Sequence, residues 1–356
     1  MRIKVRLGKV QIQLKEEKNA EYENILQSKP TNAITRAYKH NIIEDDYTGT
    51  GSTNINGIEL IVENCKENMI TETTKRIFDL IMIKFTEIIP YGEKTPLEVI
   101  DEKREININL SDYMEKCGLK NKAEARKQLT KEIDTLYNTS LKWTETRAVS
   151  EPGKKRKVMS EKTYYTRIID TKGTDNGKTI KNSVATVKLT MDLAKYLTFY
   201  GYVCPYNMNV LKLPLKTSAS PIAKAMLELD NINKENPKRR GKISIKTLLK
   251  RTGKMETYKN LNRKSGFSRK IIDTLERDLD ELVRKNIIEF WEYAKPNGER
   301  YTDEDMGYNE NEEYTGEKEI FISKAEDYLN QNIIFKLKNY PETQKKREKN
   351  QKIENL

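Results

Sequence analysis

The side chains in this sequence whose types and spacing suggest chemistry are cations placed along two expected helices. Between residues 268 and 285, Arg269, Arg277 and Arg284 fall opposite a stripe of apolar residues at helical spacing. A guanidinium can donate two parallel hydrogen bonds to O6 and N7 of guanine, whereas a lysine ammonium is a point charge suited to phosphate. The pattern therefore indicates recognition of a nucleic acid.

Residue types needed for catalysis are scarce or badly spaced. His40 is the only histidine, so a metal site with two histidines cannot be built. Cys65, Cys117 and Cys204 lie far apart without C-x-x-C spacing, which argues against a disulfide framework and a zinc site. The segment 173–179 is one residue short of a P-loop and precedes a strand-like segment, so it is interpreted as a hairpin turn. A magnesium site made only of carboxylates stays open, but we expect no catalytic residue, no metal and no cofactor.

The helix from 268 to 285 has an earlier counterpart between Lys122 and Asn138. An offset of 146 superimposes the apolar stripes, namely Leu129, Ile133 and Leu136 on Leu275, Leu279 and Leu282. Upstream, residues 106–118 match 241–253 at an offset of 135 without a gap, so the second copy has a longer loop after Gly253. Two copies of one module are the simplest interpretation.

Composition limits what such a repeated module can bind. The length of 356 residues suggests about two domains, and 66 Lys+Arg against 54 Asp+Glu give a net charge of +12. This sign favours a polyanion, with nucleic acid first and an anionic membrane surface second. No run approaches the roughly 18 apolar residues of a membrane span, and the first residues do not resemble a signal peptide. We expect a cytoplasmic protein without membrane contact.

The expected elements follow the order of a winged helix. After a helix over 71–89 come a strand over 105–110, a helix ending at Gly118, the helix from Lys122, and strands that form a hairpin. In such a helix-turn-helix the second helix can enter a major groove. The predicted fold class is α+β, with two tandem winged-helix domains related by internal duplication.

The expected organisation has four parts. They are an N-terminal arm or cap over 1–70, a first winged-helix domain over 71–205, a second over 206–335, and a basic tail over 336–356. In the second domain, Glu319–Ile322 is expected to return beside the strand that contains Trp291. Trp143 and Trp291 follow the repeated helices at equivalent places, which favours packing in the core.

The DNA contacts are predicted from the outward faces of the two helices and from one hairpin tip. The hairpin tip is expected to touch the backbone of the flanking minor groove. We hypothesise that the helix from Ser268 reads bases and that the helix from Lys122 mainly grips the backbone. The predicted DNA-binding residues are Lys127, Lys131, Lys154, Lys155, Arg156, Lys157, Arg269, Lys270, Asp273, Arg277 and Arg284.

Three segments give the chain a resemblance to a known family. They are Ile-Asn-Leu-Ser-Asp-Tyr-Met at 108–114, Leu-Lys-Leu-Pro-Leu at 211–215 and Ile-Ser-Ile-Lys-Thr-Leu-Leu at 243–249, with a longer helix after the first and last. Over about residues 70 to 335 the chain resembles the replication initiators of iteron-controlled plasmids, the Rep superfamily. The resemblance implies origin recognition at directly repeated sites in double-stranded DNA and recruitment of host replication proteins. It also implies homodimers that repress their own gene while monomers initiate.

Two other classes of protein stay open. A winged-helix transcriptional regulator would have the same folds but would bind one operator instead of an array of repeats. A nuclease or primase is disfavoured by the single histidine and by the lack of a P-loop or clustered acids. Direct repeats of about two helical turns beside an AT-rich stretch would favour initiation.

Overall fold

The computed structural model describes most of the chain. The described residues are 3–6, 20–38, 41–45, 47–92, 94–149, 158–176, 183–261, 266–302, 305, 319–322 and 325–341. His40, the predicted hairpin tip Lys154–Lys157 and the tail beyond residue 341 lie outside them. None of the described helices is long and apolar enough to cross a membrane.

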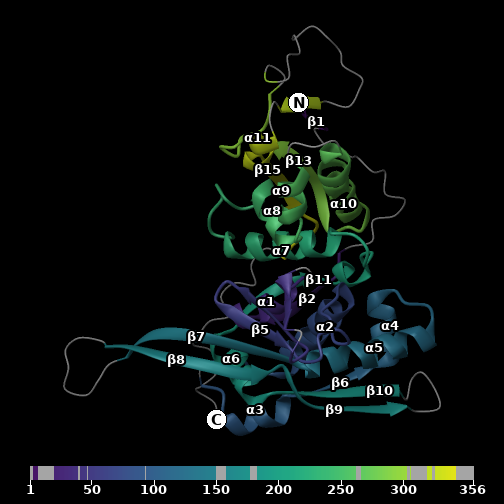
Figure 1. Ribbon diagram of the computed structural model, residues 1–356, viewed down its shortest axis with the longest axis vertical. Helices are drawn as coiled ribbons and strands as arrows, with labels where there is room; N and C mark the ends of the chain where they lie inside the picture. The colour runs from purple at the N-terminus through teal and green to yellow at the C-terminus, as the bar shows by residue number, and fades with distance from the viewer. Residues whose placement is uncertain are drawn as a thin grey trace.

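Helices and antiparallel sheets alternate along the described chain, so the predicted α+β class is confirmed. Figure 1 shows two bodies stacked along the long axis. The lower body contains α2 (Glu72–Ile88), α4 (Leu110–Cys117) and α5 (Lys122–Tyr137). The upper body contains α7 (Ala219–Ile232), α8 (Ile245–Arg251) and α10 (Asp273–Arg284).

Each body contains a module with the same strand pairing. In the lower module, β6 (Glu105–Asn109), β9 (Ile169–Asn176) and β10 (Ser183–Leu189) form a sheet in the order β6-β10-β9. In the upper module, β12 (Lys242–Ser244), β13 (Ile288–Ala294) and β15 (Asn332–Leu337) form a sheet in the order β12-β15-β13. In both, the strand before the helix pair lies antiparallel to the last strand, with Ile108 opposite Ala185 and Ile243 opposite Ile333.

The same local signals end and orient the helices of the two modules. Gly118 and Gly253 follow α4 and α8 with φ of 65° and 69°, a left-handed conformation that glycine adopts without steric cost. The apolar stripes of α5 and α10 are buried as the periodicity predicts: Leu129, Ile133, Leu136, Leu275, Leu279 and Leu282. The offset of 146 also carries α2 onto α7, with buried Leu80 and Ile81 on buried Met226 and Leu227.

The upper module differs from its prediction in two elements. The longer loop after Gly253 contains a helix, α9 (Met255–Leu261). The predicted return of Glu319–Ile322 beside the Trp291 strand is wrong, because that segment is β14 and pairs with β1 (Ile3–Arg6), whereas β15 pairs with β13. β15 has six residues with Ile333, Phe335 and Leu337 buried on one face, so it can cover the module's core.

The hairpin after α5 belongs to another sheet than the one predicted. β7 (Thr139–Val149) and β8 (Val158–Arg167) extend a five-stranded sheet with β3 (Ile43–Asp45), β4 (Thr50–Ile55) and β5 (Ile58–Val62). The interpretation of this hairpin as the wing of the first module is therefore wrong. β5 buries alternate residues, and β7 pairs with it along one edge. Leu141 of β7 lies opposite Leu60 of β5 in this pairing. Segment 173–179 was predicted to be a hairpin turn, but its residues 173–176 form the end of strand β9 and pair with β10, and residues 177–179 lie outside the described residues.

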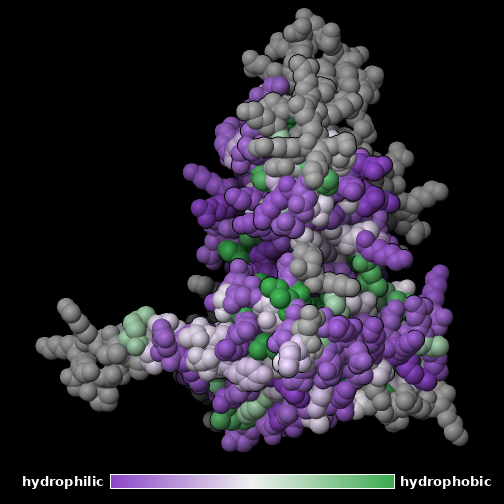
Figure 2. Space-filling model, in the orientation of Figure 1, coloured by the Kyte–Doolittle hydropathy of each residue, from purple (hydrophilic) through white to green (hydrophobic). Residues whose placement is uncertain are grey.

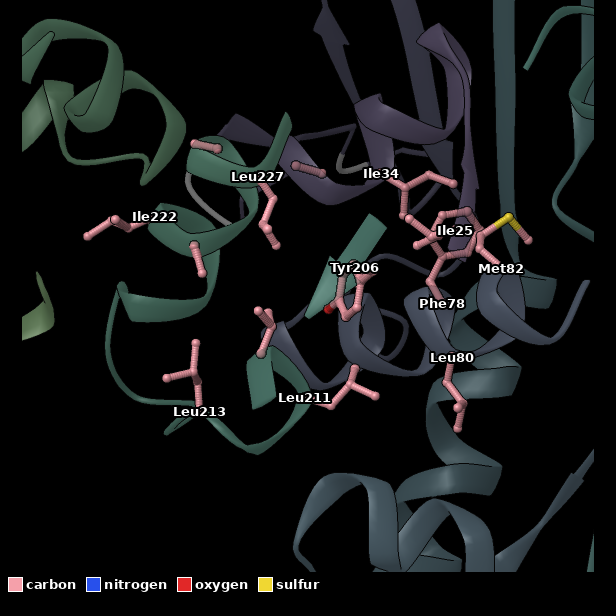
Figure 3. Packing of buried hydrophobic residues seen from close by; sticks show 14 of the residues in the cluster. Ile25, Ile34, Phe78, Leu80, Met82, Tyr206, Leu211, Leu213, Ile222 and Leu227 are labelled. Atoms are coloured by element: carbon pink, nitrogen blue, oxygen red, sulfur yellow. The ribbon is translucent and has the colours of Figure 1, made fainter. Parts of the chain in front are cut away.

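The described part of residues 1–70 contributes to both bodies. β2 (Tyr22–Gln27) pairs with β11 (Tyr202–Asn207), and α1 (Lys29–Arg36) packs beside them. Figure 3 shows the apolar core at this junction, where Ile25, Ile34, Phe78 and Met82 lie on one side and Tyr206, Leu211, Ile222 and Leu227 on the other. The core therefore continues from the lower body into the upper one.

Candidate nucleic-acid interface

The outward face of α5 carries the first set of predicted contacts. Asn121 caps this helix, and its side chain accepts hydrogen bonds from the backbone N–H of Ala123 at 3.0 Å and of Glu124 at 3.1 Å. Lys127 and Lys131 are exposed one turn apart. They border a shallow depression lined by Ala123, Arg126, Lys127, Thr130, Lys131 and Asp134. Three of these six side chains are cations and one, Asp134, is an acid, so the face carries an excess of positive charge that can approach a phosphate backbone.

Three contacts hold α5 on its sheet. The Arg126 guanidinium donates to the buried Ser183 hydroxyl at 2.8 Å, which ties the helix to β10. Asp134 forms an ion pair with Lys172 of β9. The Lys172 ammonium also lies 4.7 Å from the centre of the Tyr137 ring. Lys127 and Lys131 are therefore presented by a helix that is fixed at its start and its end.

The outward face of α10 carries the second set. The helix begins with a π-helical turn, η4 (Ser268–Ile272), which continues without a break into Asp273. All five predicted residues on this face are exposed: Arg269, Lys270, Asp273, Arg277 and Arg284. Arg284 is paired with Glu281 at 3.0 Å, and a terminal guanidinium nitrogen of Arg277 lies 3.7 Å from Asp278 Oδ1. The structure thus brings four cations and one acid onto one helix face.

A buried acid at equivalent positions fixes each of these helices. Glu132 is 5% exposed and Asp278 is 1% exposed, and they are related by the offset of 146. Glu132 accepts a hydrogen bond from Thr74 in the first turn of α2, and burial raises the pKa of its carboxyl. Asp278 Oδ2 accepts from the backbone N–H of Ser218 before α7 at 3.0 Å. In each module the acid therefore ties the second helix of the pair to the start of the preceding long helix.

Helix α8, the first helix of the upper module's pair, adds cations that could not be found by comparing α5 with α10 alone. Lys246 and Lys250 of α8 are exposed and lie one turn apart. The described residues provide no ion pair to either of them. Their counterparts at the offset of 135 are Ser111 and Glu115, so the upper module is the more basic one. The alignment that revealed the repeat could have identified this difference.

The strands on either side of the predicted hairpin tip extend away from α5. In Figure 1, β7 and β8 extend toward the left of the view, whereas α4, α5 and α10 lie on the right. The predicted tip residues Lys154, Lys155, Arg156 and Lys157 lie between these strands in the sequence and outside the described residues. The hairpin beside α5 is β9–β10, which belongs to the β6-β10-β9 sheet of the lower module. The sequence did not identify this hairpin as the wing.

The described residues give little support to metal or thiol chemistry. No group of three His, Cys, Asp or Glu side chains within the described ranges could hold a metal ion. Cys65, Cys117 and Cys204 are buried, and none of them forms a disulfide with another described residue. Burial raises the pKa of the Cys117 and Cys204 thiols to about 12, so both stay protonated at neutral pH. Figure 2 shows hydrophilic residues over most of the coloured part of the visible face.

Comparison with known proteins gives distant structural similarities. No protein-family profile and no curated protein matches the chain. A crystal structure of domains 2 and 3 of RctB is 12% identical with a TM-score of 0.40, and the match covers 87% of this chain and 98% of that one. A second crystal structure of RctB domains 2–3 is 12% identical with a TM-score of 0.35, and covers 91% of this chain and 94% of that one. What the chain does must therefore be inferred from its own residues.

Proposed function

We propose that this chain is a sequence-specific double-stranded DNA-binding protein built from two winged-helix domains related by duplication. The observation that carries the proposal is the shared module: strand, helix, helix and two further strands, with the first strand beside the last in both sheets. In each module the second helix turns its apolar stripe inward and presents exposed cations. That is the arrangement by which a recognition helix enters a major groove.

Within this function, we propose that the protein initiates replication of a plasmid or mobile element. Two recognition helices in one chain can contact successive segments of one duplex, which suits repeated origin sites longer than a single half-site. The same proposal includes recruitment of host replication proteins, formation of homodimers, and location of the protein in the cytoplasm. The segments at 108–114, 211–215 and 243–249 carry the resemblance to plasmid replication initiators on which this narrower proposal rests.

Binding-site selection tests the proposal. A library of random duplexes is selected against the purified full-length protein, and the DNA that surrounds the gene is searched for the selected sequence. We expect several direct repeats beside an AT-rich stretch. A single operator upstream of the gene would favour the transcriptional regulator, and failure to enrich any sequence would refute specific binding.

Division of labour between the two helices gives a paired prediction. Arg277→Ala should cost about 1 to 3 kcal/mol on the selected site and relax one base preference, because a bidentate contact to guanine is lost. Lys131→Ala, its counterpart at the offset of 146, should weaken binding to all sequences alike. Each variant is titrated against the selected and a scrambled duplex at two salt concentrations. If Arg277→Ala loses affinity equally on both duplexes, or Lys131→Ala loses it selectively, the roles of α5 and α10 are reversed.

We further propose that the protein works by binding and not by catalysis. Purified protein incubated with a supercoiled plasmid that carries the selected site, in magnesium or manganese, should leave the plasmid intact, since no ligand set for a metal is visible in the described ranges. The measurement is the fraction of nicked circles on a gel. Nicking at a fixed position that disappears when one acid or one tyrosine is replaced would overturn this prediction.

A further inference from the structure

One carboxylate oxygen of Asp278 accepts a hydrogen bond, and the other accepts none from the described residues. Oδ2 accepts the hydrogen bond from the Ser218 N–H at 3.0 Å and lies 3.7 Å from the Lys254 ammonium. Oδ1 is buried and has no hydrogen-bond donor among the described residues. A buried carboxylate oxygen without a donor is unfavourable, so this atom favours a donor that comes within reach.

The nearest cation to that oxygen is the side chain predicted to read bases. A terminal guanidinium nitrogen of Arg277 lies 3.7 Å from Oδ1, which is within ion-pair distance but beyond hydrogen-bond distance. The Arg277 side chain is 62% exposed, so the rest of the guanidinium is open to a ligand. The carboxylate thus lies behind the arginine, on the protein side.

Guanidinium geometry allows both contacts at once. Arginine has five N–H donors in one plane, of which two can bond O6 and N7 of guanine while others donate to a carboxylate. A long side chain that is already held in one direction loses less entropy when it binds than a free one. A fixed arginine therefore discriminates between bases better than an arginine that can swing toward phosphate.

The lower module lacks this arrangement. The residue that corresponds to Arg277 is Lys131, and the buried acid beside it, Glu132, accepts its hydrogen bond from Thr74. An ammonium has no planar pair of donors with which to select guanine. The two modules share a buried acid that anchors the helix, but only the upper one combines it with an arginine.

We propose that Asp278 is a positioning residue that orients Arg277 for bidentate recognition of a guanine in the major groove. This inference rests on the proposed function and deepens it, because it names the base and the residue that sets the preference. It predicts that the DNA site contains a guanine whose contribution to affinity depends jointly on Arg277 and Asp278.

The test measures the base preference at each position of the site. The probe is the duplex that the wild-type protein selects from a random library, together with its single-base variants. Asp278→Asn, which keeps an oxygen for the Ser218 N–H, should lose about tenfold in affinity at one guanine and little on variants that already lack it. In an Arg277→Ala background, Asp278→Asn should add no further loss at that guanine. Arg277→Lys, which leaves the buried acid intact, should lose the same guanine preference.

Glu132→Gln is the matched control, since it neutralises the equivalent acid in the lower module and should leave the preference profile unchanged. If Asp278→Asn fails to fold, the inference stands or falls on Arg277→Lys and on whether the wild-type site contains the guanine. An unchanged profile for a folded Asp278→Asn, or losses that add independently in the double variant, would overturn the inference and leave sequence-specific binding intact. A wild-type protein that enriches no sequence would overturn both.

Discussion

Replacing Asp79 with alanine is expected to destabilise the folded chain by about 3 to 5 kcal/mol. Asp79 lies in α2 of the lower body, is 2% exposed, and forms an ion pair with Lys224 of α7 in the upper body. Its Oδ2 also accepts a hydrogen bond from the Tyr206 hydroxyl at 2.8 Å. Burial raises the pKa of the Asp79 carboxyl, and the Lys224 ammonium opposes that shift. Removal of the acid leaves a largely buried ammonium and a buried hydroxyl without their acceptor.

Chemical denaturation of the full-length variant measures this loss. Glu59→Ala is the control, because Glu59 pairs with Lys142 at 3.1 Å on an exposed strand face, where such a pair contributes less than about 1 kcal/mol. A double variant, Asp79→Leu with Lys224→Met, should recover much of the stability, since apolar groups can replace a buried ion pair. A loss for Asp79→Ala as small as that for Glu59→Ala would show that this pair does not hold the two bodies together.

A second ion-pair network lies at the same junction, and it gives a reason for the two bodies to unfold together. Glu228 of α7 pairs with Arg36 of α1 and, at 3.0 Å, with Arg251 of α8. The Tyr38 hydroxyl donates to the backbone carbonyl of Arg251. These contacts join the N-terminal segment to the upper helix pair. A strong loss at Asp79 is therefore expected to appear as one cooperative transition instead of two.

The repeated helices could be predicted from the sequence because their signals are local. The stripe that contains Leu275 and Leu279, and the stop at Gly253, depend only on residues a few positions apart. Strand partners could not be predicted in this way. β7 can satisfy its alternating pattern beside any strand with an apolar face, and its choice of β5 is made by a segment about 80 residues earlier in the chain.

The candidate site shows the same difference between features set by nearby residues and features set by distant ones. Exposure of Lys127, Lys131 and Arg277 follows from helical periodicity and is confirmed. The role of Asp278 was missed because its acceptor function depends on Ser218, which is distant in the chain, and an acid within an apolar stripe carries no local sign of that contact. Lys246 and Lys250 do have a local signal, because the offset of 135 places them opposite Ser111 and Glu115.

DNA affinity is expected to fall about a thousandfold between about 50 and 200 mM salt, if about 6 phosphates are neutralised. The physical reason is release of condensed counterions, which gives a log-log slope of about −0.9 for each phosphate contacted. The exposed cations on α5, α8 and α10 are numerous enough to supply that many contacts. The measurement is a fluorescence-anisotropy titration of one duplex across the salt range.

The salt titration must distinguish the effect of where the lysines lie from the effect of the protein's net charge. Lys127→Ala with Lys131→Ala removes two charges from the α5 face and should reduce the slope by about 2. Lys66→Ala with Lys142→Ala removes the same charge from exposed lysines near the five-stranded sheet, where Lys66 pairs with Glu44 at 3.3 Å and Lys142 pairs with Glu59. This control should leave the slope unchanged. Equal reductions for the two double variants would mean that DNA responds to the overall charge of +12 and not to a defined face of α5.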